Sequence, residues 1–191
     1  MSAADLAAGR LLVATPKLED PHFTRAVVLM LDHDDDGSLG VVISRPTTVP
    51  VADVLPGWAD LVSGPDVLFS GGPVSIDSAL AVAVVSGIGN DPDDGPVGWR
   101  PIYPGAGLVD LDTPPELLRH AVSGMRIFAG YAGWGAGQLE GEIAEGAWYV
   151  VPAQTEDLLC HDAELLWRRV LRRQPGDLAF VHTCPDDPTM N

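Results

Sequence analysis

The stretch Gly130–Val150 reads GYAGWGAGQLEGEIAEGAWYV, with six glycines among aromatic and acidic side chains. Apolar runs at 127–131 and 147–151 predict strands, and the segment 138–145 between them predicts a short helix. The glycines just before that helix allow two interpretations. Their amides can hold an anion at the helix N-terminus, or their missing side chains can let aromatic rings pack directly on main chain. The pattern favours packing, and the anion site is kept as the alternative.

Short runs rich in β-branched residues predict six further strands. They lie at 10–14, 26–31, 39–43, 67–70, 79–85 and 107–111. The second and third form a hairpin around the polar tip 32–38, and Pro46 ends it because proline cannot donate to a sheet ladder. Most runs are continuously apolar rather than alternating, which predicts burial on both faces. The segment 86–107 is rich in glycine and proline and carries Asp91, Asp93 and Asp94, so it predicts a long solvated loop.

Two further helices are predicted. The sequence TPPE at 113–116 matches a capping box with proline at the first helical position, and this helix is expected to end at Gly124. The other begins near Asp162 and has a core-facing apolar stripe at 163, 166, 167, 170 and 171. Its last residues include Arg168, Arg169, Arg172 and Arg173. Stabilisation of the helix dipole accounts for these arginines, and a docking patch for nucleic acid or protein is the alternative.

The length of 191 residues fits one domain with one core. The net charge of −16 would repel a phosphate backbone, so nucleic acid is a disfavoured partner. No apolar run is long enough to span a bilayer, and the N-terminus lacks the features of a signal peptide. We therefore expect a cytoplasmic protein without a membrane partner. Only Cys160 and Cys184 are present, so no disulfide framework is implied.

Two sets of residues have the chemistry of a metal site but unfavourable spacing. The run DHDDDG at 32–37 matches the first half of a calcium loop, yet Ile43 stands where the bidentate glutamate belongs. The pairs Cys160-His161 and His182-Thr183-Cys184 offer zinc-binding atoms without the usual spacing. Neither a GxSxG serine nor a Walker phosphate loop occurs. No metal or cofactor is therefore predicted, and no catalytic residue is assigned.

These segments, in this order, resemble the YqgE/AlgH family of bacterial proteins. The resemblance rests on GRLLVATP at 9–16 with Asp20, Pro21 and Phe23, on the hairpin that ends in Arg45-Pro46, and on GGPV at 71–74. It is most specific in GYAGWGAGQLE at 130–140 and continues to the LW pair at 166–167. The resemblance implies a single α+β domain in which a bifurcated mixed β-sheet folds into a pseudo-barrel with helices packed outside. We assign this domain to residues 10–184 and expect 1–9 and 185–191 to be flexible termini.

The resemblance does not bring a known reaction, because members of the family are labelled transcriptional regulators without an established catalytic residue or cofactor. The chain departs from the family pattern at Ser44, where asparagine is common. It also departs in the acidic segment after Val85, where a histidine is common nearer the strand. If either position contributes to a site, the site of this chain differs from that of its relatives.

Three functions are weighed against one another. The leading one is a cytoplasmic regulator that acts through contacts with a protein partner or a small ligand. The alternative is an enzyme or metabolite-binding protein with an anion pocket at the two glycine turns. Direct DNA binding through the arginines of the last helix is disfavoured by the net charge. The sequence makes no prediction of oligomeric state.

The predicted pocket has a defined set of residues. Gly71, Gly72, Gly133 and Gly135 supply amides, Arg45 pairs with the anion, Tyr131 and Trp134 form a wall, and His33 or Glu140 titrates. Thr15, Asp20 and Gln138 complete the set. Their convergence on one pocket is itself a prediction.

Overall fold

The computed structural model describes residues 6–87 and 95–185. The predictions made for Asp91, Asp93 and Asp94, and for the termini at 1–5 and 186–191, lie outside these ranges. Leu6 is buried, and the Gly9 amide donates a hydrogen bond of 2.9 Å to the Met30 carbonyl. The chain is therefore packed against the sheet before the first strand begins. No helix in the described ranges is long and apolar enough to cross a membrane.

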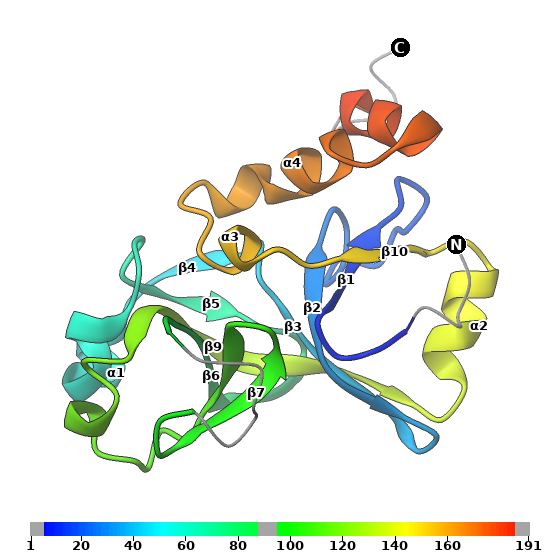
Figure 1. Ribbon diagram of the computed structural model, residues 1–191. Coiled ribbons are helices and arrows are strands. Elements are labelled where there is room, and N and C mark those ends of the chain that lie inside the picture. The colour runs from blue at the N-terminus through cyan, green and yellow to red at the C-terminus, as the bar shows by residue number, and fades with distance from the viewer. Residues whose placement is uncertain (1–5, 88–94, 186–191) are drawn as a thin grey trace.

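Ten strands form one strongly curved sheet (Figure 1). They are β1 (Arg10–Ala14), β2 (Val27–Asp34), β3 (Gly37–Val42), β4 (Pro46–Pro50), β5 (Val67–Ser70), β6 (Val74–Val85), β7 (Trp99–Tyr103), β8 (Ala106–Val109), β9 (Val122–Gly135) and β10 (Trp148–Pro152). The main order is β10-β1-β2-β3-β9-β6-β8-β7, and β5 pairs with both β9 and β4. Only the β5–β9 pair is parallel among these strands. The predicted fold class is confirmed: a single α+β domain with a mixed sheet that curls into a half-barrel.

The sheet divides at β9. Residues 132–135 of this strand pair with β3, whereas residues 122–131 pair with β6. Gly130, with φ of +70°, lies where the two parts meet. Phe128 and Tyr131 contact the same hydrophobic core although they are three residues apart, which a strand of regular period 2 does not allow. The left-handed glycine therefore exchanges the two faces of β9 at the division, as a bulge does.

Three hydrophobic clusters cover the faces of the sheet. The first lies between the two parts of the sheet and includes Leu11, Leu29, Phe69 and Phe128. It is covered by α4 (Leu166–Arg172). The second lies beneath α2 (Gln138–Ala144), and the third lies beneath α1 (Val51–Val54) and the 3-10 turn Pro56–Leu61. Figure 1 shows α4 crossing above β1 and β10, with α1 and α2 at opposite ends of the molecule.

The two helices that were predicted in the C-terminal third of the chain are present in the structure. The helix predicted at 138–145 is confirmed as α2. The helix predicted from Asp162 is confirmed as the 3-10 turn Ala163–Leu165 followed by α4, whose apolar stripe is buried. Two short elements in this part of the chain were not predicted: α3 (Thr155–Leu158), which follows β10, and the 3-10 segment Gly176–Thr183. Nor were α1 and the 3-10 turn Pro56–Leu61 predicted.

Two predictions of local structure are wrong. The segment 113–124 is not a helix, because only Pro115–Leu117 forms a 3-10 turn, no side chain caps it, and β9 begins at Val122. The segment 86–107 is not entirely loop, because β7 lies within it. The β2–β3 hairpin ends at Val42, before Arg45-Pro46, in agreement with the sequence analysis. Pro46 then begins β4, which pairs with β5 at an edge of the sheet, where a missing N–H is tolerated.

Candidate functional site

The Gly71-Gly72 turn is packed tightly against β9. The Gly71 amide donates to the Ala129 carbonyl at 2.9 Å, and the Gly71 carbonyl accepts from the Val42 amide at 2.8 Å. A Cβ atom at Gly72 would lie 2.2 Å from the Tyr131 carbonyl oxygen. Close approach of two backbones therefore explains both glycines, and the Gly71 amide is not available to an anion.

The aromatic residues beside the second glycine turn, Tyr131 and Trp134, do not form the predicted wall. Gly133 and Gly135 are exposed, and the Gly135 amide donates to the Gln138 side chain at 3.1 Å. Tyr131 packs against the core between the two parts of the sheet, whereas Trp134 belongs to the core beneath α2. Their rings thus lie on opposite faces of β9 and cannot line one pocket together.

Three predicted polar residues bind their own chain. Arg45 donates to the carbonyls of Pro21 and Thr24 at 3.1 and 3.0 Å, and burial lowers the pKa of Arg45. The Asp20 carboxylate accepts from the His22 amide at 2.7 Å. The Thr15 hydroxyl donates to the Gly146 carbonyl at 2.8 Å. These contacts fix the loops around β1, and a ligand role for the three residues stays a prediction.

His33 and Glu140 lie close to each other. His33 Nδ1 lies 2.8 Å from the Ser38 hydroxyl, and His33 Nε2 lies 3.9 Å from a Glu140 carboxylate oxygen. Ser38 lines a hollow of about 300 Å³ whose other lining residues include Asp32, Asp34 and Asp36. Three carboxylates around this hollow disfavour an anion there.

Glu142, which the sequence analysis did not single out, binds both tryptophans of the 130–150 segment, Trp134 and Trp148. Its carboxylate accepts hydrogen bonds from the indole N–H groups of Trp134 at 3.0 Å and Trp148 at 2.8 Å, and from the Gln138 amide at 3.0 Å. The rings of Phe23, Trp134 and Trp148 contact one another at centroid distances of 5.5 to 6.0 Å. The most specific part of the sequence therefore builds a packed aromatic cluster beneath α2.

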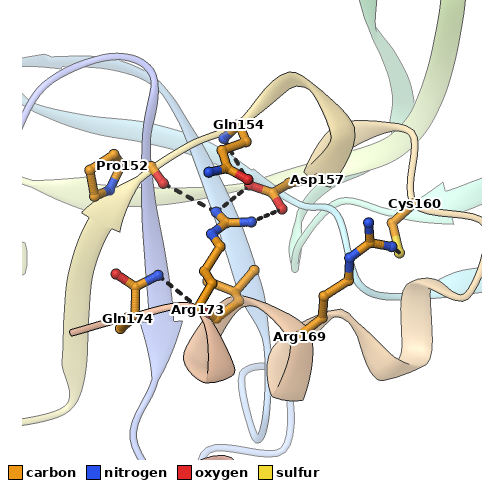
Figure 2. Close-up of polar contacts among 8 residues, drawn as sticks. Pro152, Gln154, Asp157, Cys160, Arg169, Arg173 and Gln174 are labelled. Carbon is orange, nitrogen blue, oxygen red and sulfur yellow. Dashed lines mark hydrogen bonds and ion pairs between the residues drawn. The ribbon is translucent and has the colours of Figure 1, made fainter. Parts of the chain in front are cut away.

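Several polar side chains gather instead around α3, at the open edge between the two parts of the sheet. We call the following set the α3 cluster: Tyr103, Arg126, Asp157, Cys160, Arg169 and Arg173. Asp157 and Cys160 belong to α3 and the turn after it, and Arg169 and Arg173 reach them from α4 and its C-terminal end (Figure 2). The sequence analysis considered Cys160 for zinc and the two arginines for the helix dipole, but did not place them together.

Asp157 and Arg173 form the structural part of the α3 cluster. Both carboxylate oxygens of Asp157, which is 2% exposed, accept from the Arg173 guanidinium, and one of these hydrogen bonds measures 2.6 Å. Asp157 also accepts from the Gln154 amide at 2.8 Å and so caps α3. Arg173 donates further to the Pro152 carbonyl at 3.3 Å. This bidentate pair ties α4 to the end of β10 and is more than a dipole effect.

Arg126 is the buried cation of the α3 cluster. It is 1% exposed, donates to the Cys160 carbonyl at 2.5 Å and the Gly64 carbonyl at 3.4 Å, and lies 4.1 Å above the Phe69 ring. Its Nε and Nη1 groups have no hydrogen-bond partner, and no carboxylate among the described residues pairs with it. Burial lowers the pKa of Arg126 to about 10, so the side chain is still charged near neutral pH.

Two hollows flank α3. One, of about 280 Å³, is lined by Thr155, Glu156, Leu159, Cys160, His161 and Arg169. The other, of about 530 Å³, is lined by Tyr103, Pro104, Ala153, Gln154, Thr155 and Glu156. The Tyr103 hydroxyl is buried without a partner. Burial raises the pKa of Tyr103, and the nearby Asp157 and Glu156 raise it further.

Neither metal set considered in the sequence forms a cluster. Across residues 6–87 and 95–185, no group of three or more His, Cys, Asp or Glu side chains is placed to hold a metal ion. Three of the four arginines at the end of the last helix contact their own chain: Arg168 with the His182 carbonyl, Arg169 with Cys160 Sγ and Arg173 with Asp157. These contacts leave little of the predicted basic patch for a nucleic acid.

The chain is similar to known proteins over nearly its whole length. A sequence-family profile described as AlgH-like matches residues 11–179. Two proteins called UPF0301, from Streptomyces avermitilis and Streptomyces coelicolor, are 62% and 63% identical to it over 183 residues, which is 96% of this chain and 94% of each relative.

Two solved structures have the same fold. The crystal structure of a protein from Corynebacterium diphtheriae has a TM-score of 0.88 and 35% identity, and the match covers 93% of this chain and 92% of that chain. The solution structure of the AlgH protein from Pseudomonas aeruginosa has a TM-score of 0.69 and 25% identity, with 96% of each chain covered. The fold described above is thus shared by these proteins.

Proposed function

The chain belongs to the AlgH-like family, and from this premise we propose that it is a cytoplasmic regulatory protein whose signal is a small anionic ligand. We place the ligand in the hollow of about 280 Å³ beside α3. The ligand class is the one expected from the sequence, but the location differs from the two glycine turns. The location differs because the amides and Arg45 at the glycine turns already donate hydrogen bonds within the chain.

The observation that carries this proposal is Arg169, an exposed arginine that lines the hollow, together with the buried guanidinium of Arg126, which donates to the carbonyl of the lining residue Cys160. An isolated buried charge costs several kcal/mol of folding free energy, so such a group is retained where its charge is used. Arg169 lines the hollow and is exposed, and His161 lies beside it. In a chain of net charge −16, Arg169 and the nearby Arg126 form a local concentration of positive charge to which a small anion is attracted. Glu156 also lines the hollow, so we expect the anionic group at the Arg169 end.

The alternative location, at the glycine turns, has weaker support. The amides of Gly71 and Gly135 already donate within the chain, and Arg45 donates to two carbonyls. The hollow nearest Trp134 is lined by carboxylates. A site there would have to break existing hydrogen bonds before it bound an anion.

The test is a thermal-shift and calorimetric titration of the full chain with inorganic phosphate, citrate and 3-phosphoglycerate. A ligand at about a hundred times its Kd stabilises the folded state by about 2.7 kcal/mol, which raises Tm measurably. We expect Arg169→Ala to remove the shift. The matched control is Arg172→Ala, which removes an exposed arginine from the same helix and should keep it.

Two results would overturn the proposal. One is the absence of a Tm shift with all three anions. The other is a shift that survives Arg169→Ala but disappears in Arg45→Ala, which would return the ligand to the glycine turns.

A further inference from the structure

Cys160 lies at a hollow that small molecules can enter. The residue is 4% exposed and lines the hollow of about 280 Å³ beside α3. Arg169 Nη1 donates to Cys160 Sγ at 3.5 Å, and Figure 2 shows the guanidinium lying against the sulfur. The thiol therefore has one charged hydrogen-bond donor directly beside it.

A second guanidinium approaches the same residue from beneath. Arg126 donates to the Cys160 carbonyl, and its Nε and Nη1 groups are buried without partners. The negative charge of a Cys160 thiolate opposes the lowering of the Arg126 pKa that burial causes, so the two charges interact. Of the carboxylates in the described ranges, none pairs with Arg126. A thiolate at Cys160 would therefore place a negative charge beside a buried cation that has no carboxylate partner in the described ranges.

We propose that Cys160 is an oxidation site at which hydrogen peroxide converts the thiolate to a sulfenic acid. Thiolates next to arginine side chains are the cysteines that react as nucleophiles. The sulfur uses a lone pair to attack one peroxide oxygen, the O–O bond breaks, and the other oxygen leaves as hydroxide, which takes a proton to become water. Sulfur loses two electrons and peroxide gains them. Arg169 is placed to donate a hydrogen bond to the departing oxygen.

The size of the hollow and the burial of the sulfur select the oxidant. A residue as buried as Cys160 excludes bulky disulfides more strongly than it excludes a molecule of two oxygen atoms. The reaction needs no bound anion and therefore goes beyond the proposed function. It would give the protein a second input, because the added oxygen enters the hollow assigned to the ligand.

The test uses the full chain, reduced and free of added anions, treated with hydrogen peroxide and then with dimedone, which traps sulfenic acids. Peptide mass spectrometry should show the adduct on Cys160 in the wild type and in Cys184→Ser, and none in Cys160→Ser. The rate of labelling should fall roughly tenfold in Arg169→Ala. It should recover in part in Arg169→Lys and stay unchanged in Arg172→Ala, and circular dichroism of each variant confirms its fold.

Three results would overturn the inference. They are equal labelling of Cys160 and Cys184, no adduct under conditions that label free glutathione at the same pH, and an unchanged rate in Arg169→Ala. The two proposals are separated in the wild type, where peroxide labelling is measured without added anions and the anion-induced Tm shift is measured without peroxide. Dimedone labelling of Cys160 without a Tm shift supports this inference and overturns the proposed function, and a Tm shift without labelling does the reverse.

Discussion

Tyr103 and Arg126 each bury polar atoms that have no hydrogen-bond partner, and both side chains approach α3. Unsatisfied buried groups are few in native proteins, and each one costs about 1–3 kcal/mol. Two such residues lie near the four-residue helix α3, so their unsatisfied polar atoms lower the stability of this part of the molecule. Structure of this kind is typical of functional sites rather than of packing cores.

Tyr103→Phe is expected to stabilise the protein by about 1 kcal/mol at neutral pH, because it removes a buried hydroxyl without a partner. It should also change the alkaline limb of the stability curve. Burial raises the pKa of Tyr103 above its usual value of 10.0. Above that pH the unfolded chain loses the phenolic proton while the folded chain keeps it, so the free energy of unfolding falls as pH rises. The variant should therefore lose less stability above about pH 10.

The measurement is urea unfolding of wild type and Tyr103→Phe at a series of alkaline pH values. Arg126 contributes with the opposite sign, because burial lowers its pKa to about 10, but this contribution is common to both proteins and cancels in the comparison. If the free energy of unfolding falls equally with pH in the two proteins, the pKa of Tyr103 is not raised in the folded state.

The residues of the α3 cluster were only partly accessible from sequence. Cys160 and the arginines of α4 were noted, but as separate motifs, since nothing in a linear pattern shows that α4 returns across α3. Arg126 was missed although a signal exists: it is a single charge within the apolar run MRIF at 125–128. A charged residue inside a strand buried on both faces has to find a partner in the interior, and this argument could have located it.

At the scale of elements, the apolar runs predicted strands well. The predictions at 10–14, 26–31 and 67–70 correspond to β1, β2 and β5. The capping-box prediction at 113–116 failed because a local signal was overridden by long-range pairing, in which Val122 joins Val85 of β6. The edge strands β4 and β7 were missed because both contain proline, which argues against a strand, and both are too short to show a clear period. The bulge at Gly130 was hidden because the glycine cluster reads equally as a turn.

Gly72→Ala and Gly141→Ala are expected to have opposite effects. A Cβ atom at Gly72 would lie 2.2 Å from both the carbonyl carbon and the carbonyl oxygen of Tyr131, so β9 and the turn after β5 would have to separate. We expect a loss of about 3 kcal/mol or more in the free energy of unfolding. Gly141 lies within α2 with nothing within 4 Å of an added Cβ, so its replacement should stabilise the helix by about 0.5–1 kcal/mol.

Urea denaturation of the two variants measures both effects in one experiment. A Gly72→Ala protein as stable as the wild type would mean that the turn moves freely away from β9, and the close approach would then not be the reason for this glycine.

At the scale of the whole molecule, charge works against folding. The chain carries 27 acidic and 11 basic residues besides its histidines, and the compact state brings the excess negative charges closer together. Surface charges interact over about 10 Å at an ionic strength of 0.1 M and over longer distances at lower salt. Added salt should therefore stabilise the folded protein, because screening weakens repulsion between acidic residues more than it weakens attraction between opposite charges.

Raising the concentration of potassium chloride from a few millimolar to physiological strength should increase the free energy of unfolding. Sodium chloride and choline chloride should act equally, because screening depends on charge and not on the kind of cation. The measurement is urea unfolding at each salt concentration. A decrease in stability would show that attractive pairs dominate, and an effect of only one cation would show specific binding.

The pairing of β1 with β10 has a consequence for synthesis of the chain. The Thr15 hydroxyl donates to the Gly146 carbonyl 131 positions later, and β1 has β10 along one of its edges. While the ribosome makes the intervening residues, that edge of β1 stays open, and an open edge is a template for pairing with other chains. A nascent chain released before β10 is made would therefore have its first hairpin formed but one edge of β1 unpaired, and that edge could pair with another chain.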